Sequence, residues 1–332
     1  MKMQLKRMLT IAVVTAAPSI GVAAASITND LVVHLAFDNS YQNSVPNAVK
    51  ATPVGQPSFA TGKVGSHALA FSTTTGRANY VTLGAPTELN FGSTTDFSVA
   101  FWVKFTKWDS NPALVSNKDW TSTFTPGWTI ATSRPGGFVW NLRESNGAGA
   151  YTYFGPFGKL GNTNWHHMAV SFDRGGNASA YFDGVLVNET PIGVGTPTVD
   201  TEPGLATNIG QDGTGLYPDA TIDDGMIDDL GIWRRVVTVE EIKQIYDAGL
   251  RGENLLTAGS APVVKDPPKI TAIAILKADL TISWTNTVGA ATLQKKTALS
   301  DANWLNVVTN SNQKATIPLE GQAAFYRVVV NP

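Results

Sequence analysis

The fold of this 332-residue chain is decided by one stretch, Asp96-Phe97-Ser98-Val99-Ala100-Phe101-Trp102-Val103-Lys104-Phe105. The side chains of a β-strand alternate between the two faces of a sheet, so the odd-numbered positions from 97 to 105 form one apolar face. The other face carries Ser98, Trp102 and Lys104, which suits a sheet surface that is partly solvated. The stretch therefore predicts a strand of an antiparallel sheet.

Further strands follow along the chain. Residues 165–173 and 178–182 alternate in the same way. Asp183-Gly184 tolerates positive φ and predicts a tight hairpin into a third strand at 185–187. Short alternating strands separated by turn residues are typical of an all-β protein.

One helix and a second small sandwich complete the pattern. Thr238 and Glu241 have the spacing of a capping box, and Gly249 lies where a left-handed residue just past the end of the helix is expected. We expect this helix to close one end of the sandwich core. Residues 252–268 lack periodicity and predict a linker. Residues 269–332 predict a small β-sandwich, with strands at 280–284, 291–294, 315–319 and 325–330.

The composition excludes several classes of function. The chain has 24 Lys and Arg against 26 Asp and Glu, a net charge of −2, so it lacks the cationic excess of a nucleic-acid-binding protein. It has no cysteine, which excludes disulfides, thiol catalysis and zinc–cysteine sites. Its 31 glycines and 18 prolines favour short strands and turns over helices.

The N-terminus predicts export. Lys2, Lys6 and Arg7 precede an apolar stretch that ends in the small residues Ala23-Ala24-Ala25, which is typical of a secretory signal peptide over residues 1–25. An uncleaved anchor is the alternative. After removal of the signal we expect no transmembrane segment. The protein is then secreted or held at the cell surface, with the periplasm as a further location.

Five motifs in order carry a family resemblance. The region that contains them resembles the concanavalin A-like lectin/glucanase superfamily in its laminin-G-like branch. The resemblance implies an antiparallel two-sheet jelly-roll sandwich over residues 27–251. The tail, through Thr281–Trp284 and Phe325–Arg327, is similar to an immunoglobulin- or fibronectin-III-like sandwich. The five motifs are His34–Asn39, Gly62–Phe71, Asp96–Lys104, Trp165–Val170 with Tyr181–Gly184, and Ile227–Trp233.

Acidic residues near both ends of the predicted jelly roll suggest a cation site. Asp38 ends the first strand, and Asp228 and Asp229 lie in the last, with Asp223 and Asp224 just before it. Calcium takes six to eight oxygen ligands and tolerates irregular geometry. The resemblance implies a structural Ca²⁺ with Asp38 and Asp228 as ligands. Solvated turn carboxylates are the alternative.

A mixture of aromatic and polar residues predicts a ligand surface at the rim. Flat aromatic rings stack on the apolar faces of sugars, while Asp and Lys hydrogen-bond their hydroxyls. We therefore expect contacts to an extracellular polysaccharide or glycoprotein. Packing of these aromatic rings in the core is the alternative. The candidate residues are Trp108, Lys118, Asp119, Trp120, Tyr151 and Tyr153.

No catalytic motif is evident. The resemblance would place an E-x-D-x-x-E strand in catalytic members, and that motif is absent. The adjacent His166 and His167 point to opposite faces of a strand, which favours a structural role. We predict an exported, non-catalytic glycan- or protein-binding module of the adhesion type. The alternatives are a polysaccharide hydrolase or lyase using Asp119 with Glu144, and a structural cell-surface or matrix component.

Overall fold

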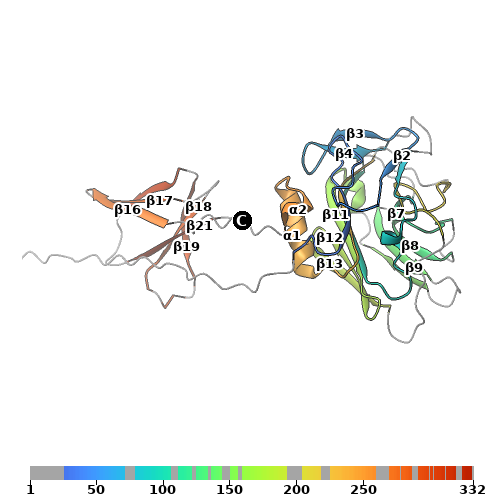
Figure 1. The fold of residues 1–332 in the computed structure, drawn as a ribbon. Coiled ribbons are helices and arrows are strands. Elements are labelled where there is room, and N and C mark those ends of the chain that lie inside the picture. Colours follow the sequence, from blue (N-terminus) through green and yellow to red (C-terminus); the bar gives the residue numbers. More distant parts are fainter. Residues whose placement is uncertain are drawn as a thin grey trace, which may run out of the picture. The chain divides into compact units, whose positions relative to one another are not determined.

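The computed structural model describes most of residues 26–330. It divides the chain into two compact units, one formed by Ala24–Ser260 and another that contains Ala261–Pro332 (Figure 1). The ranges outside the description are 1–25, 72–78, 106–110, 122–124, 134–135, 144–149, 156–158, 193–203, 218–224, 259–268, 277, 286–290, 299, 302, 311, 319–323 and 331–332.

The large unit is built from two antiparallel sheets. The eight-stranded sheet runs β13 (Val185–Pro191), β12 (Asn177–Phe182), β11 (Trp165–Phe172), β6 (Phe97–Phe105), β15 (Gly225–Trp233), β4 (His67–Ala70) and β3 (Ser58–Thr61), and β1 (Leu31–Leu35) also pairs with β15. The seven-stranded sheet runs β10 (Ala150–Phe154), β9 (Gly137–Arg143), β8 (Gly127–Ser133), β7 (Ala113–Ser116), β14 (Asn208–Ile209), β5 (Tyr80–Thr82) and β2 (Thr52–Val54). Short 3₁₀ helices occupy Thr87–Leu89 and Leu160–Asn162.

The main core lies between these two sheets. Figure 1 shows β11 and β12 in one layer and β7, β8 and β9 in the other. All five odd-numbered residues of β6 belong to this core, as the alternation predicts. Trp128 and Trp140 fill the core from the opposite sheet and are 0% exposed. The predicted antiparallel two-sheet jelly roll is confirmed.

The outer face of β6 differs from the expectation. Helix α1 (Val239–Leu250) and the short helix α2 (Leu255–Ala258) pack on the eight-stranded sheet and bury this face. Ser98, Ala100 and Trp102 are therefore buried rather than partly solvated. The prediction that the helix closes one end of the main core is wrong, because its apolar stripe forms a second core on the outside of the sheet.

The helix starts as predicted and ends later. Thr238 and Glu241 form the complete capping box. Gly249, expected just past the end, lies inside the helix, and a Cβ atom there would collide with the indole ring of Trp102. The residue with the left-handed backbone is Gly252, at φ +76°. Gly249 is therefore required by close packing and not by helix termination.

The predicted hairpin explains the two histidines. Asp183 and Gly184 take positive φ values of 51° and 74° between β12 and β13. The Asp183 carboxylate contacts His166 Nδ1 at 2.8 Å and accepts the backbone N–H of His167 at 2.9 Å. The His167 ring packs on the other side, 5.3 Å from the Trp102 ring. Both histidines therefore serve packing and turn formation.

The small unit is a sandwich of two three-stranded sheets within the residues that the structure describes. Its core includes the buried side chains of Leu280, Ile282, Trp284, Leu293 and Tyr326. Two strands of this unit, β16 and β19, were not predicted. One sheet runs β16 (Lys269–Leu276), β17 (Asp279–Thr285) and β20 (Lys314–Pro318), and the other runs β19 (Leu305–Asn310), β18 (Ala291–Lys296) and β21 (Phe325–Val330).

The expected linker at 252–268 begins later in the structure. Leu255 and Ala258 are buried in the outer core of the large unit. The Gly252 carbonyl accepts the N–H of Gly65 at 3.1 Å. None of the helices in the described ranges is long and apolar enough to cross a membrane.

Candidate functional site

The candidate site lies on the face of the seven-stranded sheet that points away from the main core. Along β8 and β9, alternate residues point away from the main core, so their burial requires a second cover on this side. That cover includes the turn after β7 and residues 211–217. Four side chains of this face are 0% exposed: Thr129, Ala131, Val139 and Asn141.

The turn after β7 places a lysine under this cover. The Asn117 side-chain oxygen accepts the N–H of Trp128 at 2.8 Å, which fixes the turn against β8. The hydroxyl of Ser116 accepts the N–H of Lys118 at 3.2 Å. These bonds direct Lys118 inward, where it is 0% exposed.

Lys118 begins a row of hydrogen-bonded polar side chains across three segments. Its Nζ donates to Oδ1 of Asn141 in β9. Nδ2 of Asn141 donates in turn to the Thr152 hydroxyl in β10 at 2.7 Å. We call Lys118, Asn141 and Thr152 the Lys118 row. The row aligns because Asn141 and Thr152 are directly paired in the two neighbouring strands.

The surroundings of Lys118 disfavour its positive charge. Burial and, to a smaller extent, the nearby Arg143 lower the pKa of Lys118 from 10.5 to about 7, while Asp119 acts in the opposite direction. The Trp120 ring lies over the ammonium, with Nζ 5.5 Å from the ring centroid. Lys118 therefore titrates near neutral pH, which is a property found often at functional sites.

Asp212 fastens the cover over the row. Its Oδ2 accepts the N–H of Trp120 at 2.9 Å, and its Oδ1 accepts the N–H groups of Thr214 and Gly215 at 3.0 and 3.1 Å. Asp212 is 0% exposed. The cover also has a small apolar cluster, formed by Ala113, Trp120, Ala131, Val139 and Tyr217.

The structure corrects the expected rim surface. Trp120 is only 7% exposed and Lys118 is fully buried, so neither presents the open contact surface that we expected. Tyr153 packs against the main core, with its ring 6.3 Å from that of Phe138. The rings of Trp120 and Tyr153 therefore pack inside the protein, which was the alternative to contact with a ligand.

Of the other predicted contact residues, one forms a turn and the rest lie partly or wholly outside the described residues. Asp119 is half-buried, and its carboxylate accepts the N–H of Thr121 at 2.9 Å, which is a turn-forming role. Tyr151 lies in β10 opposite Leu142, but its side chain is outside the described part. Trp108 and Glu144 also lie outside the described residues.

Sequence reasoning missed Asn141, Thr152 and Asp212. The alternation of Gly137–Arg143 was a usable signal, because Asn141 interrupts the apolar residues on both sides of it. Asp212 carried no local signal, since its partner Trp120 is 92 positions away in the sequence.

The two predicted metal ligands contact the same loop. Oδ1 of Asp38 accepts the N–H groups of Ser66 and His67 at 2.6 and 2.8 Å. Oδ2 of Asp228 accepts the N–H groups of Lys63 and Val64 at 2.8 and 2.9 Å. We call residues 62–67 with these two aspartates the acidic loop. The acidic residues Asp223 and Asp224 are outside the described range.

Burial strongly affects the carboxylates beside this loop. It raises the pKa of Asp228 to about 7, although the N–H donors of Val64 and Lys63 oppose the change. Burial also raises the pKa of Asp229, which contacts His34 Nε2 at 2.9 Å. A nearby cation would relieve the cost of burying these charges.

The acidic loop fits calcium only if the ion takes most of its ligands from groups other than side-chain carboxylates. Within the described ranges, no group of three or more His, Asp or Glu side chains is arranged to hold a metal ion. An ion bound here would take most of its ligands from backbone carbonyls and water, which calcium accepts. Asp38 and Asp228 are the two carboxylates that the loop brings to it.

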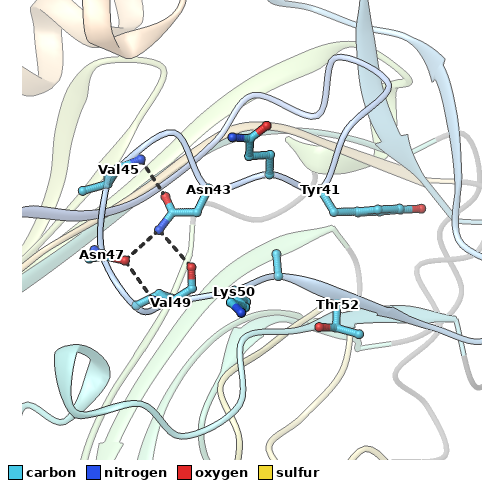
Figure 2. A pocket seen from close by; sticks show the side chains of 9 residues that line it. Tyr41, Asn43, Val45, Asn47, Val49, Lys50 and Thr52 are labelled. Atoms are coloured by element: carbon cyan, nitrogen blue, oxygen red, sulfur yellow. Dashed lines mark hydrogen bonds between the residues drawn. The ribbon is translucent and has the colours of Figure 1, made fainter.

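A separate hollow of about 400 Å³ lies between residues 41–47 and 49–52. Figure 2 shows Asn43 and Asn47 at its wall, bonded to each other and to the backbone of Val45 and Val49. Asn43 Oδ1 also accepts the N–H of His34 at 2.9 Å. These amides are committed to holding the loop, so we place the candidate site at the Lys118 row instead.

Comparison with known proteins agrees with this architecture. A laminin-G family model, described as the concanavalin A-like lectin/glucanases superfamily, matches residues 75–243. The chain belongs to this superfamily. The likeness of the small unit to a fibronectin-III sandwich stays a prediction. A search of curated proteins gives no match.

Several solved binding domains share the fold of this superfamily member. The binding domain of Paraclostridial mosquitocidal protein 1 aligns with a TM-score of 0.56 at 13% identity, over 77% of this chain and 64% of that chain. The ligand-binding domain of botulinum neurotoxin serotype D, solved with N-acetylneuraminic acid, aligns at 0.52 and 15% identity, over 86% and 70%. The receptor-binding domain of the C/D mosaic serotype aligns at 0.52 and 14%, over 84% and 69%. At these identities the likeness concerns the fold alone.

Proposed function

We propose that the large unit is a non-catalytic glycan-binding module of an exported protein, with its site at the Lys118 row and the adjoining strand ends. The observation that carries this proposal is the row itself, in which the buried Lys118 and Asn141 fix the partly exposed Thr152 on a sheet face outside the main core. Thr152 and Arg143 are the partly exposed polar side chains here, and their hydroxyl and guanidinium groups match sugar hydroxyls. Membership of a lectin-containing superfamily adds support.

The acidic residues near the row favour binding over hydrolysis. Glycosidases need two carboxyl groups on either side of the scissile bond, one of which donates a proton. The carboxylates of Asp119 and Asp212 instead accept N–H groups of their own turns. The two acidic side chains described beside the row thus stabilise turns.

One observation favours a second candidate, a polysaccharide lyase. Lys118, with a pKa of about 7, is the base that such an enzyme would use, although it is 0% exposed and a substrate would have to reach it beneath the cover. Arg143, close enough to affect that pKa, would stabilise negative charge on a substrate. The same experiment separates the two functions.

The test is a panel of polysaccharides examined for both retention and turnover. We expect retention on at least one glycan without new reducing ends or unsaturated products. Arg143→Gln removes the cation at the end of β9, the strand that contributes Asn141 to the row. Lys104→Gln makes the same charge change near the end of β6 in the other sheet. Retention should fall in Arg143→Gln and persist in Lys104→Gln. Equal retention by both variants would place binding elsewhere, and turnover would establish the enzyme.

We also propose a structural calcium ion at the acidic loop, with Asp38 and Asp228 as its carboxylate ligands. Chelation should lower the melting temperature of the wild type. Asp38→Asn should lower the melting temperature and remove the sensitivity to the chelator. Asp247→Asn, at a partly exposed position on α1, should respond as the wild type does. An unchanged melting curve in a metal-stripped sample would remove calcium from this proposal.

Export is proposed on the N-terminal sequence. Lys2, Lys6 and Arg7 before an apolar segment and an Ala-rich end support a signal over residues 1–25. The partner would then be an extracellular polysaccharide or glycoprotein. Mass spectrometry of the mature N-terminus tests this, since export with cleavage predicts a first residue near Ser26. An intact Met1 in the extracellular fraction would contradict cleavage.

A further inference from the structure

The small unit carries a second polar surface, on the outer face of the sheet formed by β19, β18 and β21. Ala291, Leu293 and Tyr326 point into the core of this unit. The intervening positions of β18 and β21 therefore point outward, and Gln294 lies opposite Arg327 there. Asn306 of β19 lies opposite Gln294 on its other side. These three side chains form a continuous row across the three strands.

The hydrogen bonds within this row determine what it can offer a ligand. Nε of Arg327 donates to Oε1 of Gln294 at 2.7 Å, and Nε2 of Gln294 donates to Oδ1 of Asn306 at 2.7 Å. An arginine side chain has no acceptor, so this orientation of the amides is the only one that satisfies the row. Each amide oxygen thereby accepts a hydrogen bond within the row. The remaining groups are N–H donors of all three residues.

Trp304 holds two cations beside the row. The Arg327 guanidinium carbon lies 4.4 Å from the centre of the Trp304 ring, and Lys296 Nζ lies 5.1 Å from it. Such contacts orient a guanidinium group and leave its outer N–H groups available. The Lys296 ammonium also donates to the Asp301 carbonyl. Both cations are therefore positioned before any ligand arrives.

The charge near this face is not balanced by the unit's own acids. Residues 269–332 contain six Lys and Arg against three Asp and Glu, while residues 27–268 contain 15 against 23. Asp301 is the acidic residue closest to Lys296 in sequence, and its carboxylate accepts the N–H groups of Thr297 and Ala298 at 3.2 and 2.8 Å. This carboxylate is thus committed to its own turn.

We propose that this face, formed by Gln294, Lys296, Trp304, Asn306 and Arg327, binds an acidic polysaccharide through its uronate carboxylates. A row whose amide oxygens already accept one bond each, and whose other polar groups are N–H donors, favours ligands rich in acceptor oxygens. The planar fork of Arg327 matches a carboxylate, and charge-assisted bonds of this kind are stronger than neutral ones. The amide donors of Gln294 and Asn306 suit the neighbouring ring hydroxyls. This inference is independent of the function proposed for the large unit.

The experiment measures binding of the full chain to polygalacturonate, with its methyl-esterified form as a neutral control of the same backbone. We expect binding to the acidic polymer, weakened by salt, and little to the ester. Arg327→Gln should weaken binding roughly tenfold, because one charge-assisted interaction is lost. Lys296→Gln should also weaken it. Lys314→Gln, on the other sheet of the same unit, should bind as the wild type does.

Three outcomes would overturn the proposal. Equal binding by the wild type and Arg327→Gln, with both folded by their tryptophan fluorescence and melting curves, would show that this face is not used. Equal binding to the methyl ester would show that the carboxylates are not recognised. Polyglutamate carries the same charge on a different backbone, and equal affinity for it would indicate a general cationic surface or an acidic protein partner.

Discussion

Replacement of Lys118 by methionine tests the buried site most directly. Methionine keeps a long unbranched side chain but does not titrate. Lys118 is 0% exposed, and burial lowers its pKa from 10.5 to about 7. Between these two values, the unfolded chain holds a proton at this position that the folded chain has lost. The free energy of unfolding therefore rises with pH across this interval.

The size of the effect follows from the shift in pKa. One proton taken up on unfolding changes the free energy of unfolding by about 1.4 kcal/mol for each pH unit. The free energy of unfolding of the wild type should therefore rise by roughly 2 kcal/mol between pH 7.5 and 9.0 because of this residue. At pH 7 and below, the same residue costs stability because the charged amine is buried without compensation from bulk water.

Urea unfolding at several pH values measures this difference. As the pH falls from 9.0 to 7.5, the free energy of unfolding of the wild type should drop by roughly 2 kcal/mol relative to Lys118→Met, because only the wild type contains the titrating amine. Lys104→Met is the matched control in β6 and should keep the wild-type pH dependence. If the wild type and Lys118→Met show parallel pH profiles from 7.5 to 9.0, the burial argument for this lysine is wrong.

Three further predictions concern the outer core. Burial lowers the pKa of His167 to about 4, so the folded protein resists protonation of this ring as the pH falls from 6.5 toward 4. The free energy of unfolding of the wild type, measured with urea, should therefore fall by up to roughly 3 kcal/mol over this interval, and that of His167→Phe should fall less. Gly249→Ala should cost about 1–3 kcal/mol by thermal unfolding, because the new methyl group meets Trp102. Thr238→Ala removes the side-chain cap of α1 and should cost about 1 kcal/mol by the same measurement. A full-strength pH dependence in His167→Phe, or unchanged melting in either of the other variants, would contradict these assignments.

Much of the fold could be predicted because its signals are local. The period-two pattern of residues 97–105 specified one core face of β6, and Asp183-Gly184 specified a hairpin through its backbone preferences. The capping box similarly located the start of α1. The burial of the outer face of β6 was not predicted because it depends on where α1 packs. The apolar stripe of an amphipathic helix shows that one side is buried, but not which surface it covers.

The candidate site was less accessible to prediction. Lys118 and Trp120 were singled out for their types, and they do lie together, yet Asp212 holds a cover over them. Whether an aromatic ring stacks on a ligand or on its own protein depends on such distant segments. Asn141 entered the site only because β9 aligns it with Thr152.

Periodicity, turn residues and ordered motifs are properties of neighbouring positions, so the amino-acid sequence alone determined that this chain forms antiparallel strands and belongs to a two-sheet class. Three-dimensional packing decided that Lys118 is buried with an altered pKa and that Arg327, Gln294 and Asn306 join into a row of donors. The physical reason is that exposure, charge balance and hydrogen-bond direction depend on atoms brought together from remote parts of the chain.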